Sequence, residues 1–437
     1  MNLLADELND LLDKTIAGRL LSNLGRRLYF PKGIIAQAGE AKKAAHRANA
    51  TIGMAYTKGK PLALSSITDR LPALTPEESL VYAPTAGVEE LRKAWKDRII
   101  QHNPSLRGKS ISLPAVVPGI TAGISYAADL FFDQRQTLMV GDPCWDNYGL
   151  IFTERRGGEL RGIPLFGAGE GTGSEPGLDL AALERGIREA VQKGGPLRLL
   201  LNFPNNPSGY TPRAAEAEAL IALIRKTAEE GTDVLVICDD AYFGLFYEEA
   251  IARESLFAAL ADLHERVLAI KIDGPTKEDY VWGFRVAFLT VASRGLMEEH
   301  YDALGKKLLG AIRSSVSCAN TAAQYLTIKA LSDPRTDGEK ALHYRTLRSR
   351  YQAVRRFITE NPGHPRLKPL PFNSGYFMCF RCTGIDAEVL RRELLAKHGI
   401  GVIALGPDYL RVSYAGVDEE DIPGVYRAIY DTALQPG

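Results

Sequence analysis

Lys277 is the residue of this sequence whose position best suits covalent chemistry. It follows the apolar run RVLAIKI and lies in a turn that contains Gly274 and Pro275. A lysine withdrawn from bulk water in such a turn loses proton affinity and becomes a nucleophile for a carbonyl group. Arg285 comes eight residues later and could pair with a phosphate group through two hydrogen bonds. One lysine and one arginine carry little weight alone, because most such residues are solvated surface charges.

Other polar residues also come directly after apolar runs. Asp239 and Asp240 end the run VLVICDD, and Tyr242 follows them. An acid at the end of a buried strand is costly unless it meets a cation. Asn206 lies in a stiff, proline-containing turn, where its amide is a rigid hydrogen-bond donor. Each of these residues also has a plain structural interpretation, as a helix cap or as part of a turn.

Thr121 and Trp145 complete the set. The run VVPGITAG leads from a strand through a glycine turn into a helix, and this places the Thr121 hydroxyl at a helix N-terminus, a natural phosphate seat. Trp145 follows a strand, so its ring could lie flat on another ring or simply belong to the core. Together the strand-end residues supply a phosphate seat, a ring stack, an acid, a phenol, an amide and a lysine. Such a combination is hard to obtain by chance.

Alternating strand and helix patterns position these residues. From about residue 115 to residue 290, strand-like runs alternate with amphipathic segments such as AEAEALIALIRKTAEEG. The strand-like runs are QTLMV, LRLLLNF, DVLVICDD, RVLAIKI and FRVAFLTV. The alternation predicts an α/β fold with a mostly parallel sheet covered by helices on both faces. Ligands of such sheets bind at the carboxyl ends of the strands, where the candidate residues lie.

The rest of the chain predicts a second, smaller domain. Residues 293–361 show the pattern of long helices, and a strand–helix–strand–helix pattern follows Pro369. We therefore predict a large domain over 61–325 and a small C-terminal α/β domain over 326–437, joined by an N-terminal segment over 1–60. The glycine-rich stretch 167–177 predicts a surface loop.

Composition favours small-molecule partners. The chain has 437 residues, 45% hydrophobic and 24% charged, which is typical of a globular protein. Basic and acidic residues both total 53, so there is no electrostatic footprint for nucleic acid or an anionic membrane. The N-terminus predicts an amphipathic helix rather than a signal peptide, and no stretch approaches the roughly 20 apolar residues of a membrane span. We expect a cytoplasmic protein without membrane or nucleic-acid partners.

Two of the five cysteines, Cys379 and Cys382, form a C-x-x-C motif. No second C-x-x-C or H-x-x-H is present to complete a zinc site. The surrounding run has the pattern of a strand, where residues three apart face opposite sides. Two core cysteines are therefore favoured over a redox or metal pair, and we expect no metal.

In their order along the chain, these residues resemble the class I and II aminotransferases, pyridoxal-phosphate enzymes of fold type I. The resemblance runs from about Gly53 to the C-terminus. It rests on Tyr82-Ala-Pro-x-x-Gly87, the Gly119 turn, Trp145, Asn206-Pro-Ser-Gly, Asp239-Asp-Ala-Tyr242, Lys277, Arg285 and Arg411. The lysine-to-arginine spacing and the N-P-S-G turn are its most specific parts. The resemblance implies pyridoxal 5′-phosphate as cofactor.

By this resemblance, Lys277 forms the internal aldimine and then moves a proton between the substrate Cα and the cofactor C4′. Asp239, three residues before the tyrosine, keeps the pyridine nitrogen protonated and makes the ring an electron sink. Asp240 is the less favoured acid. Tyr242 and Asn206 bond the ring phenolate oxygen, which lowers the proton affinity of the aldimine.

The remaining implied roles concern the ring, the substrate and the phosphate. Trp145 stacks on the ring. Arg411 binds the substrate α-carboxylate through two hydrogen bonds, and Asn206 and the Gly53 backbone line the same substrate site. The implied phosphate contacts are Gly119, Ile120, Thr121, Thr276, Arg285 and, from a neighbouring subunit, Tyr82.

Some positions depart from the family pattern. The family often has serines one and three residues before the lysine, where this chain has Thr276 and Gly274, so one phosphate contact is missing. A histidine common beside the pyridine acid in the aspartate group is matched by Tyr148, whereas Asn147 fits the pattern. These changes leave the cofactor assignment intact and leave the close subfamily open.

Arg313 bears on the substrate. It resembles the arginine that binds the side-chain carboxylate of dicarboxylic substrates from across a dimer, and Ser317 fits the same run. Relatives without acidic substrates also have an arginine there, with a structural role. We predict aspartate or glutamate as amino donor and a 2-oxo acid such as 2-oxoglutarate as acceptor, with aromatic amino acids as a further option. If Tyr82 and Arg313 act across an interface, the active unit is a homodimer with shared sites.

Two other functions stay open at this point. The same cofactor and fold serve lyases and decarboxylases, and no feature of the sequence decides which substrate bond breaks. A non-catalytic binding protein that kept the fold is the third alternative, and the retained lysine, arginines and acid argue against it.

Overall fold

The computed structural model describes residues 3–12, 15, 21, 23–28, 33–167 and 177–435. The predicted N-terminal amphipathic helix appears as α1, Leu3–Leu12. The stretch predicted as a glycine-rich surface loop lies outside the described residues, apart from its ends at Gly167 and Gly177.

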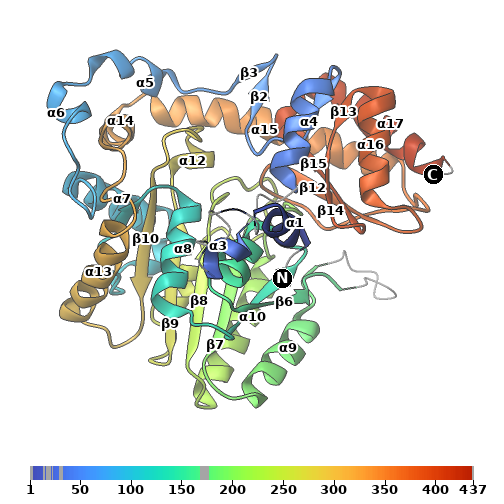
Figure 1. The fold of residues 1–437 in the computed structure, drawn as a ribbon. Coiled ribbons are helices and arrows are strands. Elements are labelled where there is room, and N and C mark those ends of the chain that lie inside the picture. The colour runs from blue at the N-terminus through green and yellow to red at the C-terminus, as the bar shows by residue number, and fades with distance from the viewer. Residues whose placement is uncertain are drawn as a thin grey trace.

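A seven-stranded sheet forms the centre of the molecule (Figure 1), in the order β4-β10-β9-β8-β7-β5-β6. The strands are β4 Ala115–Val117, β5 Thr137–Asp142, β6 Glu159–Pro164, β7 Leu197–Asn202, β8 Val234–Asp239, β9 Val267–Asp273 and β10 Ala287–Ala292. Only β10 runs antiparallel to its neighbours; the other pairs are parallel. The predicted α/β fold with a mostly parallel sheet is confirmed.

Helices cover both faces of this sheet, because alternate residues of each strand point to opposite sides. On β8, Leu235 and Ile237 belong to one apolar cluster, and Val236 and Cys238 belong to the other. The first cluster includes residues of α8 Ile120–Phe131 and α13 Glu298–Arg313. The second includes residues of α7 Glu89–His102, α9 Leu180–Gln192, α10 Ala214–Glu229 and α11 Leu256–Leu260.

A second, antiparallel sheet forms near the C-terminus, in the order β11-β12-β15-β14. Its strands are β11 Leu367–Pro369, β12 Phe377–Cys382, β14 Ile403–Leu405 and β15 Tyr409–Ser413, and its helices are α16 Ala387–His398 and α17 Ile422–Leu434. The predicted strand NSGYFMCF begins only at Phe377. Its first residues bond elsewhere: Asn373 Nδ2 donates to the Thr211 carbonyl at 2.8 Å, and Ser374 N donates to the Gly209 carbonyl at 2.9 Å.

Two connecting helices and the N-terminal segment join the two sheets. The helices are α14 Thr321–Ser332 and α15 Thr336–Glu360. In the N-terminal segment, β1 Ala48–Asn49 pairs in parallel with β13 Ile400–Gly401. From α4, Ile34–Ala44, the Gln37 amide bonds both backbone groups of Ala404, at 2.9 and 3.0 Å. The predicted limits of the domains, 1–60, 61–325 and 326–437, stay a prediction.

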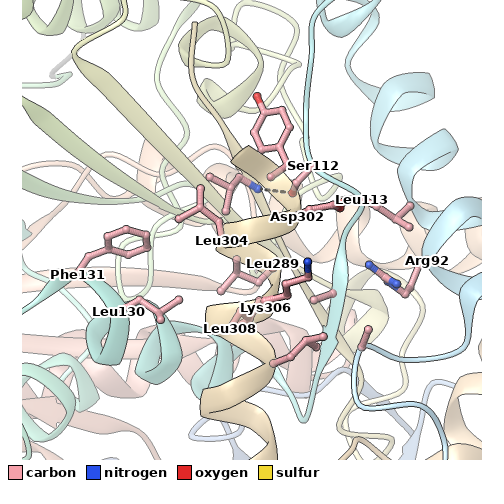
Figure 2. A pocket seen from close by; sticks show the side chains of 16 residues that line it. Arg92, Ser112, Leu113, Leu130, Phe131, Leu289, Asp302, Leu304, Lys306 and Leu308 are labelled. Atoms are coloured by element: carbon pink, nitrogen blue, oxygen red, sulfur yellow. Dashed lines mark hydrogen bonds between the residues drawn. The ribbon is translucent and has the colours of Figure 1, made fainter. Parts of the chain in front are cut away.

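A cavity of about 270 Å³ lies between α13 and the β4–β10 edge of the central sheet (Figure 2). Six of its sixteen lining residues are leucines, and Arg92 and Lys306 also line it. None of the residues singled out from the sequence for chemistry lines it.

Other features bear on the sequence predictions. Within the part of the chain that the structure describes, no helix combines the length and the apolar character needed to cross a membrane. Cys379 and Cys382 are both buried in β12, and burial raises the pKa of the Cys382 thiol to about 12.

Candidate active site

A cavity of about 200 Å³ opens where β7, β8 and β9 end. It brings together Gly53, Ile120, Thr121, Trp145, Asn206, Asp239, Tyr242, Thr276, Lys277, Arg285 and Arg411, all of which the sequence had singled out. Sequence reasoning missed four further residues of its wall, which are Ile34, Asn202, Ala241 and Phe377. Asn202 carried a usable signal, since it is a polar residue at the end of an apolar strand, like Asp239.

Lys277 lies in the short helix α12, Pro275–Glu278, that follows β9. Its Nζ is 5.1 Å from the centre of the Tyr242 ring. Burial lowers the pKa of Lys277 to about 8, because it outweighs the attraction of the Asp239 carboxylate, and Arg285 lowers the pKa further. Among the described residues, none forms an ion pair with this amine. The lowered pKa makes the neutral, nucleophilic form of this amine more accessible than in an ordinary lysine.

Asp239 is the last residue of β8 and is buried. The Tyr148 hydroxyl donates to its Oδ2 at 2.5 Å, and the Ala241 N–H donates to its Oδ1 at 3.2 Å. Burial raises the pKa of Asp239 to about 6, while the Tyr148 hydrogen bond and the charge of Lys277 act in the opposite direction. A carboxylate in this position would be stabilised by a cation in the cavity.

Asp240 makes different contacts from its neighbour and does not line the cavity. It forms a short ion pair with Lys271 and accepts a hydrogen bond from the Ser255 hydroxyl at 2.6 Å. Lys271 also lies 3.4 Å from Asp273 Oδ2. Asp240, Lys271 and Asp273 therefore form a buried group of charges outside the cavity wall.

The start of α8 forms a seat for an anion. Gly119 precedes the helix with φ 95°, a left-handed conformation that favours glycine. A Cβ at this position would lie 2.1 Å from Arg285 Nη2, so the absence of a side chain makes room for the guanidinium. Thr121 lines the cavity here, and the buried Thr276 hydroxyl has no hydrogen-bond partner among the described residues. Helix N-terminal N–H groups and a guanidinium suit a phosphate group.

Gly274 explains why the second family serine is missing. A Cβ at this position would lie 2.9 Å from Ala287 Cα and 3.0 Å from the Val286 carbonyl oxygen. The turn that carries Lys277 therefore packs directly against the backbone of β10. A serine here would force the turn and the strand apart.

Arg411, on β15, is a buried cation without a carboxylate partner in the described part of the chain. Its Nη1 donates to Asn206 Oδ1 and its Nη2 to the Thr51 carbonyl, both at 3.0 Å. The guanidinium lies 4.4 Å from the centre of the Phe377 ring. Its Nε is buried without a hydrogen-bond partner. The group is held in place and keeps unused donors, as the binding of a carboxylate requires.

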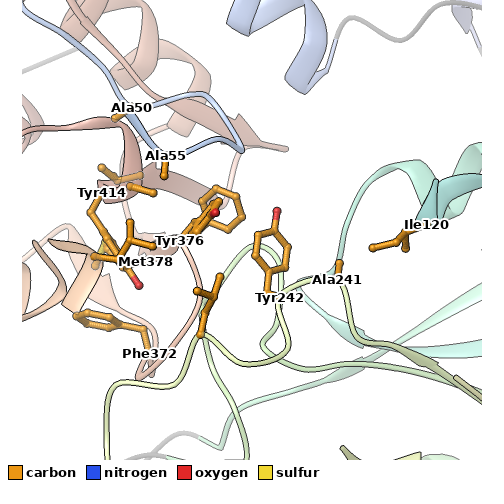
Figure 3. Packing of buried hydrophobic residues seen from close by; sticks show 14 of the residues in the cluster. Ala50, Ala55, Ile120, Ala241, Tyr242, Phe372, Tyr376, Met378 and Tyr414 are labelled. Carbon is orange, nitrogen blue, oxygen red and sulfur yellow. The ribbon is translucent and has the colours of Figure 1, made fainter. Parts of the chain in front are cut away.

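Tyr242 stands where three parts of the chain meet (Figure 3). It comes from the loop after β8, and its ring centre lies 5.5 Å from that of Tyr376 in the C-terminal part. Ala50 and Ala55 of the N-terminal segment belong to the same apolar cluster. One wall of the cavity therefore depends on contacts between distant parts of the sequence.

Tyr82 and Arg313 lie outside this cavity. Tyr82 is 92% exposed. Arg313 is exposed at the end of α13, where its Nη1 donates to the Ser317 hydroxyl at 3.1 Å. The resemblance assigned both residues to the site of a neighbouring subunit, and these roles stay a prediction.

The sequence profile of the family "Aminotransferase class I and II" matches residues 54–429. A probable aspartate/prephenate aminotransferase of Aquifex aeolicus is 26% identical over 366 residues, which is 79% of this chain and 82% of the relative. An aspartate aminotransferase of Thermotoga maritima is 25% identical over 343 residues, 76% of this chain and 78% of the relative. The crystal structure of an aminotransferase from Anaerococcus prevotii superposes with a TM-score of 0.81 at 22% identity, covering 97% of this chain and all of that one.

The chain belongs to the class I and II aminotransferases, enzymes that use pyridoxal 5′-phosphate to transfer an amino group. The resemblance drawn from the sequence motifs is confirmed, and so are the fold type, the enzyme class and the cofactor.

Proposed function

We propose that Lys277 binds the cofactor covalently and that the enzyme transfers the amino group of aspartate or glutamate to a 2-oxo acid such as 2-oxoglutarate. The observation that carries the first part is the state of the Lys277 amine. It lies in the cavity at the end of β9, without an ion-pair partner in the described structure, and with a pKa of about 8. An amine in this state is a nucleophile for an aldehyde at neutral pH.

The residues of the cavity fit the cofactor. The start of α8, Arg285 and the unpaired Thr276 hydroxyl would hold its phosphate. Asp239 would hold the ring nitrogen in its protonated form, and Trp145 would lie against the ring. When bound, pyridoxal phosphate supplies an electron sink for the electrons left on the substrate Cα.

Lys277 would also act as the acid–base group. Once its Nζ is released from the cofactor, the amine can take the proton from the substrate Cα. A pKa near the working pH suits this transfer in both directions. The Tyr242 ring beside the amine limits where the Nζ can move.

Arg411 would orient the substrate. It lines the cavity, and Lys277 and Arg285 are the other basic residues among the described residues of the cavity wall. A two-pronged contact with the α-carboxylate would fix the substrate, so that its Cα faces the Lys277 amine. Asn206 holds one guanidinium nitrogen and would share this carboxylate site with the Gly53 backbone.

The dicarboxylate preference is supported by Arg313 and by two similar proteins that are named as aspartate or aspartate/prephenate aminotransferases. Arg313 would serve the site of a partner subunit in a homodimer. Exposed apolar residues lie beside Tyr82, with Leu80 at 81% and Val81 at 54% exposure. Thr321, at the start of α14, binds the backbone of Val81 and Ala83, which ties this surface to the start of α14. Burying such a surface against a second copy would bring Tyr82 into the neighbouring site.

A visible absorption spectrum tests the central proposal. Purified protein supplied with pyridoxal phosphate should show the band of the lysine-bound cofactor, and borohydride should fix the cofactor to Lys277. Aspartate alone should bleach the band, and 2-oxoglutarate should restore it. A band that aspartate leaves untouched would refute the dicarboxylate part, and no band at all would refute the role of Lys277.

Subunit mixing tests the shared sites. The variants K277A and R313A should each be inactive with aspartate as donor. A hybrid dimer keeps one site with Lys277 from one subunit and Arg313 from the other, so re-association of an equal mixture should recover about a quarter of wild-type activity. K277A mixed with R411A is the matched control, because both residues serve the same site and no hybrid is repaired. Full activity of a sedimenting monomer would refute the dimer.

A further inference from the structure

The two residues after Lys277 are acids with no role in the chemistry described above. Glu278 and Asp279 meet two cations from other elements, Arg98 on α7 and Lys340 on α15. Arg98 Nη2 lies 3.0 Å from both Glu278 Oε1 and Asp279 Oδ1. Lys340 Nζ lies 2.9 Å from Glu278 Oε1 and 2.6 Å from Asp279 Oδ1. We call these four residues the flanking charge cluster.

The flanking charge cluster is electrically balanced and largely shielded from water. Its four side chains are between 6% and 17% exposed. Burial by itself raises the pKa of Glu278, but Arg98 and Lys340 lower it to well below its usual value, so the carboxylate is ionised. His102 lies 4.0 Å from Glu278, and burial lowers its pKa, which favours the neutral imidazole. Two positive and two negative charges therefore neutralise each other beside Lys277.

None of the four residues lines the cavity, so the cluster acts on the chain rather than on a ligand. The next Cα along the chain is only about 3.8 Å away, so fixing Glu278 also restricts Lys277. Two further contacts hold the same stretch. The Tyr376 hydroxyl donates to the Lys277 carbonyl at 2.9 Å, and the ring centres of Tyr280 and His343 lie 5.0 Å apart.

The stretch also contains strained backbone. Tyr280 has φ 58°, in the left-handed region that residues other than glycine rarely adopt. Such a conformation persists only where the surroundings impose it. Here α15 contributes both Lys340 and His343 to the stretch that directly follows Lys277.

We propose that Arg98 and Lys340 are positioning residues for the cofactor lysine, which hold the Lys277 turn by pairing with Glu278 and Asp279. This inference rests on the proposed role of Lys277 and adds to it. Lys340 does so from the 25-residue helix α15, whose later residue Arg350 pairs with Asp418 in the C-terminal part. The position of Lys277 is thereby tied to a helix that also contacts the C-terminal part of the chain.

A double-mutant cycle on the Lys340–Asp279 pair tests the inference. The readouts are the rate at which bound cofactor is lost to a carbonyl trap, followed by its visible band, and the amide hydrogen exchange of the peptide around Lys277. K340M leaves the buried cluster with one excess negative charge and D279N leaves it with one excess positive charge, so each should release cofactor about tenfold or more faster. K340M/D279N removes both charges and should come back to within about threefold of wild type.

The matched control is the exposed ion pair between Arg266 and Asp233, with atoms 2.7 Å apart. R266M should leave both readouts unchanged, because exposed pairs contribute little. If the single variants lose thermal stability but release cofactor at the wild-type rate, the cluster is only structural and the inference fails. A double variant as fast as the singles also overturns it.

Asp279→Asn is nearly isosteric and keeps the test decisive if K340M does not fold. Release from D279N at the wild-type rate, with unchanged exchange around Lys277, would then overturn the inference. A wild-type protein that never forms the visible band would instead refute the proposed role of Lys277.

Discussion

Lys271 on β9 and Lys277, six residues further on in the turn that follows this strand, have pKa values shifted in opposite directions. Lys271 is buried within β9 and faces Asp240 and Asp273. Burial alone lowers its pKa, but these two acids raise it above the usual value. Lys277 is also withdrawn from water, meets no acid at ion-pair distance in the described structure, and has its pKa lowered to about 8. Burial therefore makes a lysine reactive only where the fold withholds a counter-charge.

Two buried arginines repeat this contrast. Arg350 pairs with Asp418 and donates to two backbone carbonyls, so its guanidinium is committed to the fold. Arg411 is equally buried, but its Nε lacks a partner and no acid pairs with it among the described residues. In both pairs, the cation without an acid is the one that lines the cavity.

Replacing either lysine with methionine should give the largest effects, and the two effects should differ in kind. K277M should abolish covalent binding of the cofactor and lose all measurable transfer, while the cofactor-free protein stays as stable as wild type or gains stability. K271M leaves Asp240 and Asp273 without their cation, and unfolding should become easier by about 3–5 kcal/mol. Denaturant unfolding of both cofactor-free variants, with borohydride trapping, measures the two effects. A K271M protein as stable as wild type would contradict the structural role.

The arginines offer the next largest effect. R411Q should lower kcat/KM for aspartate by about 100- to 1000-fold, because two hydrogen bonds to a charged group are lost. R411K should fall in between, since an ammonium lacks the forked geometry. R350M is the comparison variant, and steady-state kinetics should find its KM unchanged although its melting temperature falls. If R411Q and R350M change KM equally, Arg411 has no special role in binding aspartate.

The pH dependence of chemical labelling distinguishes the two lysines by their pKa values. In the cofactor-free protein, an amine-specific reagent should label Lys277 with a midpoint near pH 8, against 10.5 for an ordinary lysine, and should leave Lys271 unlabelled. The Asp239 carboxylate raises the pKa of Lys277, so D239N should move this midpoint to lower pH. Peptide mass mapping over a pH series gives both values. A midpoint above pH 10 would show that burial does not govern this amine.

Removing one hydroxyl gives the smallest predicted effect. In Y148F the ionised form of Asp239 loses a hydrogen bond, so the pKa of this carboxyl should rise from about 6 by about one unit. Cofactor affinity falls as Asp239 becomes protonated, and the acid limb of its pH profile should therefore move to higher pH. Y351F is the control, because Tyr351 bonds Glu248 away from the cavity. If the acid limb does not move, the Tyr148 hydrogen bond to Asp239 does not influence cofactor binding.

The sequence predicted the part of the site that lies on strand ends. Lys277, Asp239 and Asn206 follow apolar runs, and the parallel sheet brings such ends to one edge. Phe377 and Ile34 come from the C-terminal and N-terminal parts, which meet only through tertiary contacts that no local pattern encodes. Lys271 lies inside the apolar run RVLAIKI and Lys277 follows it, and only the folded structure shows which of the two has acids nearby.

The flanking charge cluster was equally invisible in the sequence. Charged residues such as Arg98 and Lys340 on amphipathic helices look like solvated surface residues. Arg98 and Lys340 become buried against Glu278 because α7 and α15 pack beside the turn that carries Lys277. This packing is a tertiary feature that no local sequence pattern encodes.

The pairing of β1 with β13 has a consequence for how the protein is made. In the same segment, Gln37 and its partner Ala404 are 367 residues apart, so the segment that carries Gln37 must wait until residue 404 has been made. At about 5–20 residues per second that wait is roughly 20–70 s. Gly53, which belongs to this early segment and lines the cavity, can take its place only then. The nascent chain should therefore acquire a complete cofactor site only after residue 404 has been made, and a ribosome stalled before residue 400 would carry a chain whose central sheet can form but whose active site cannot.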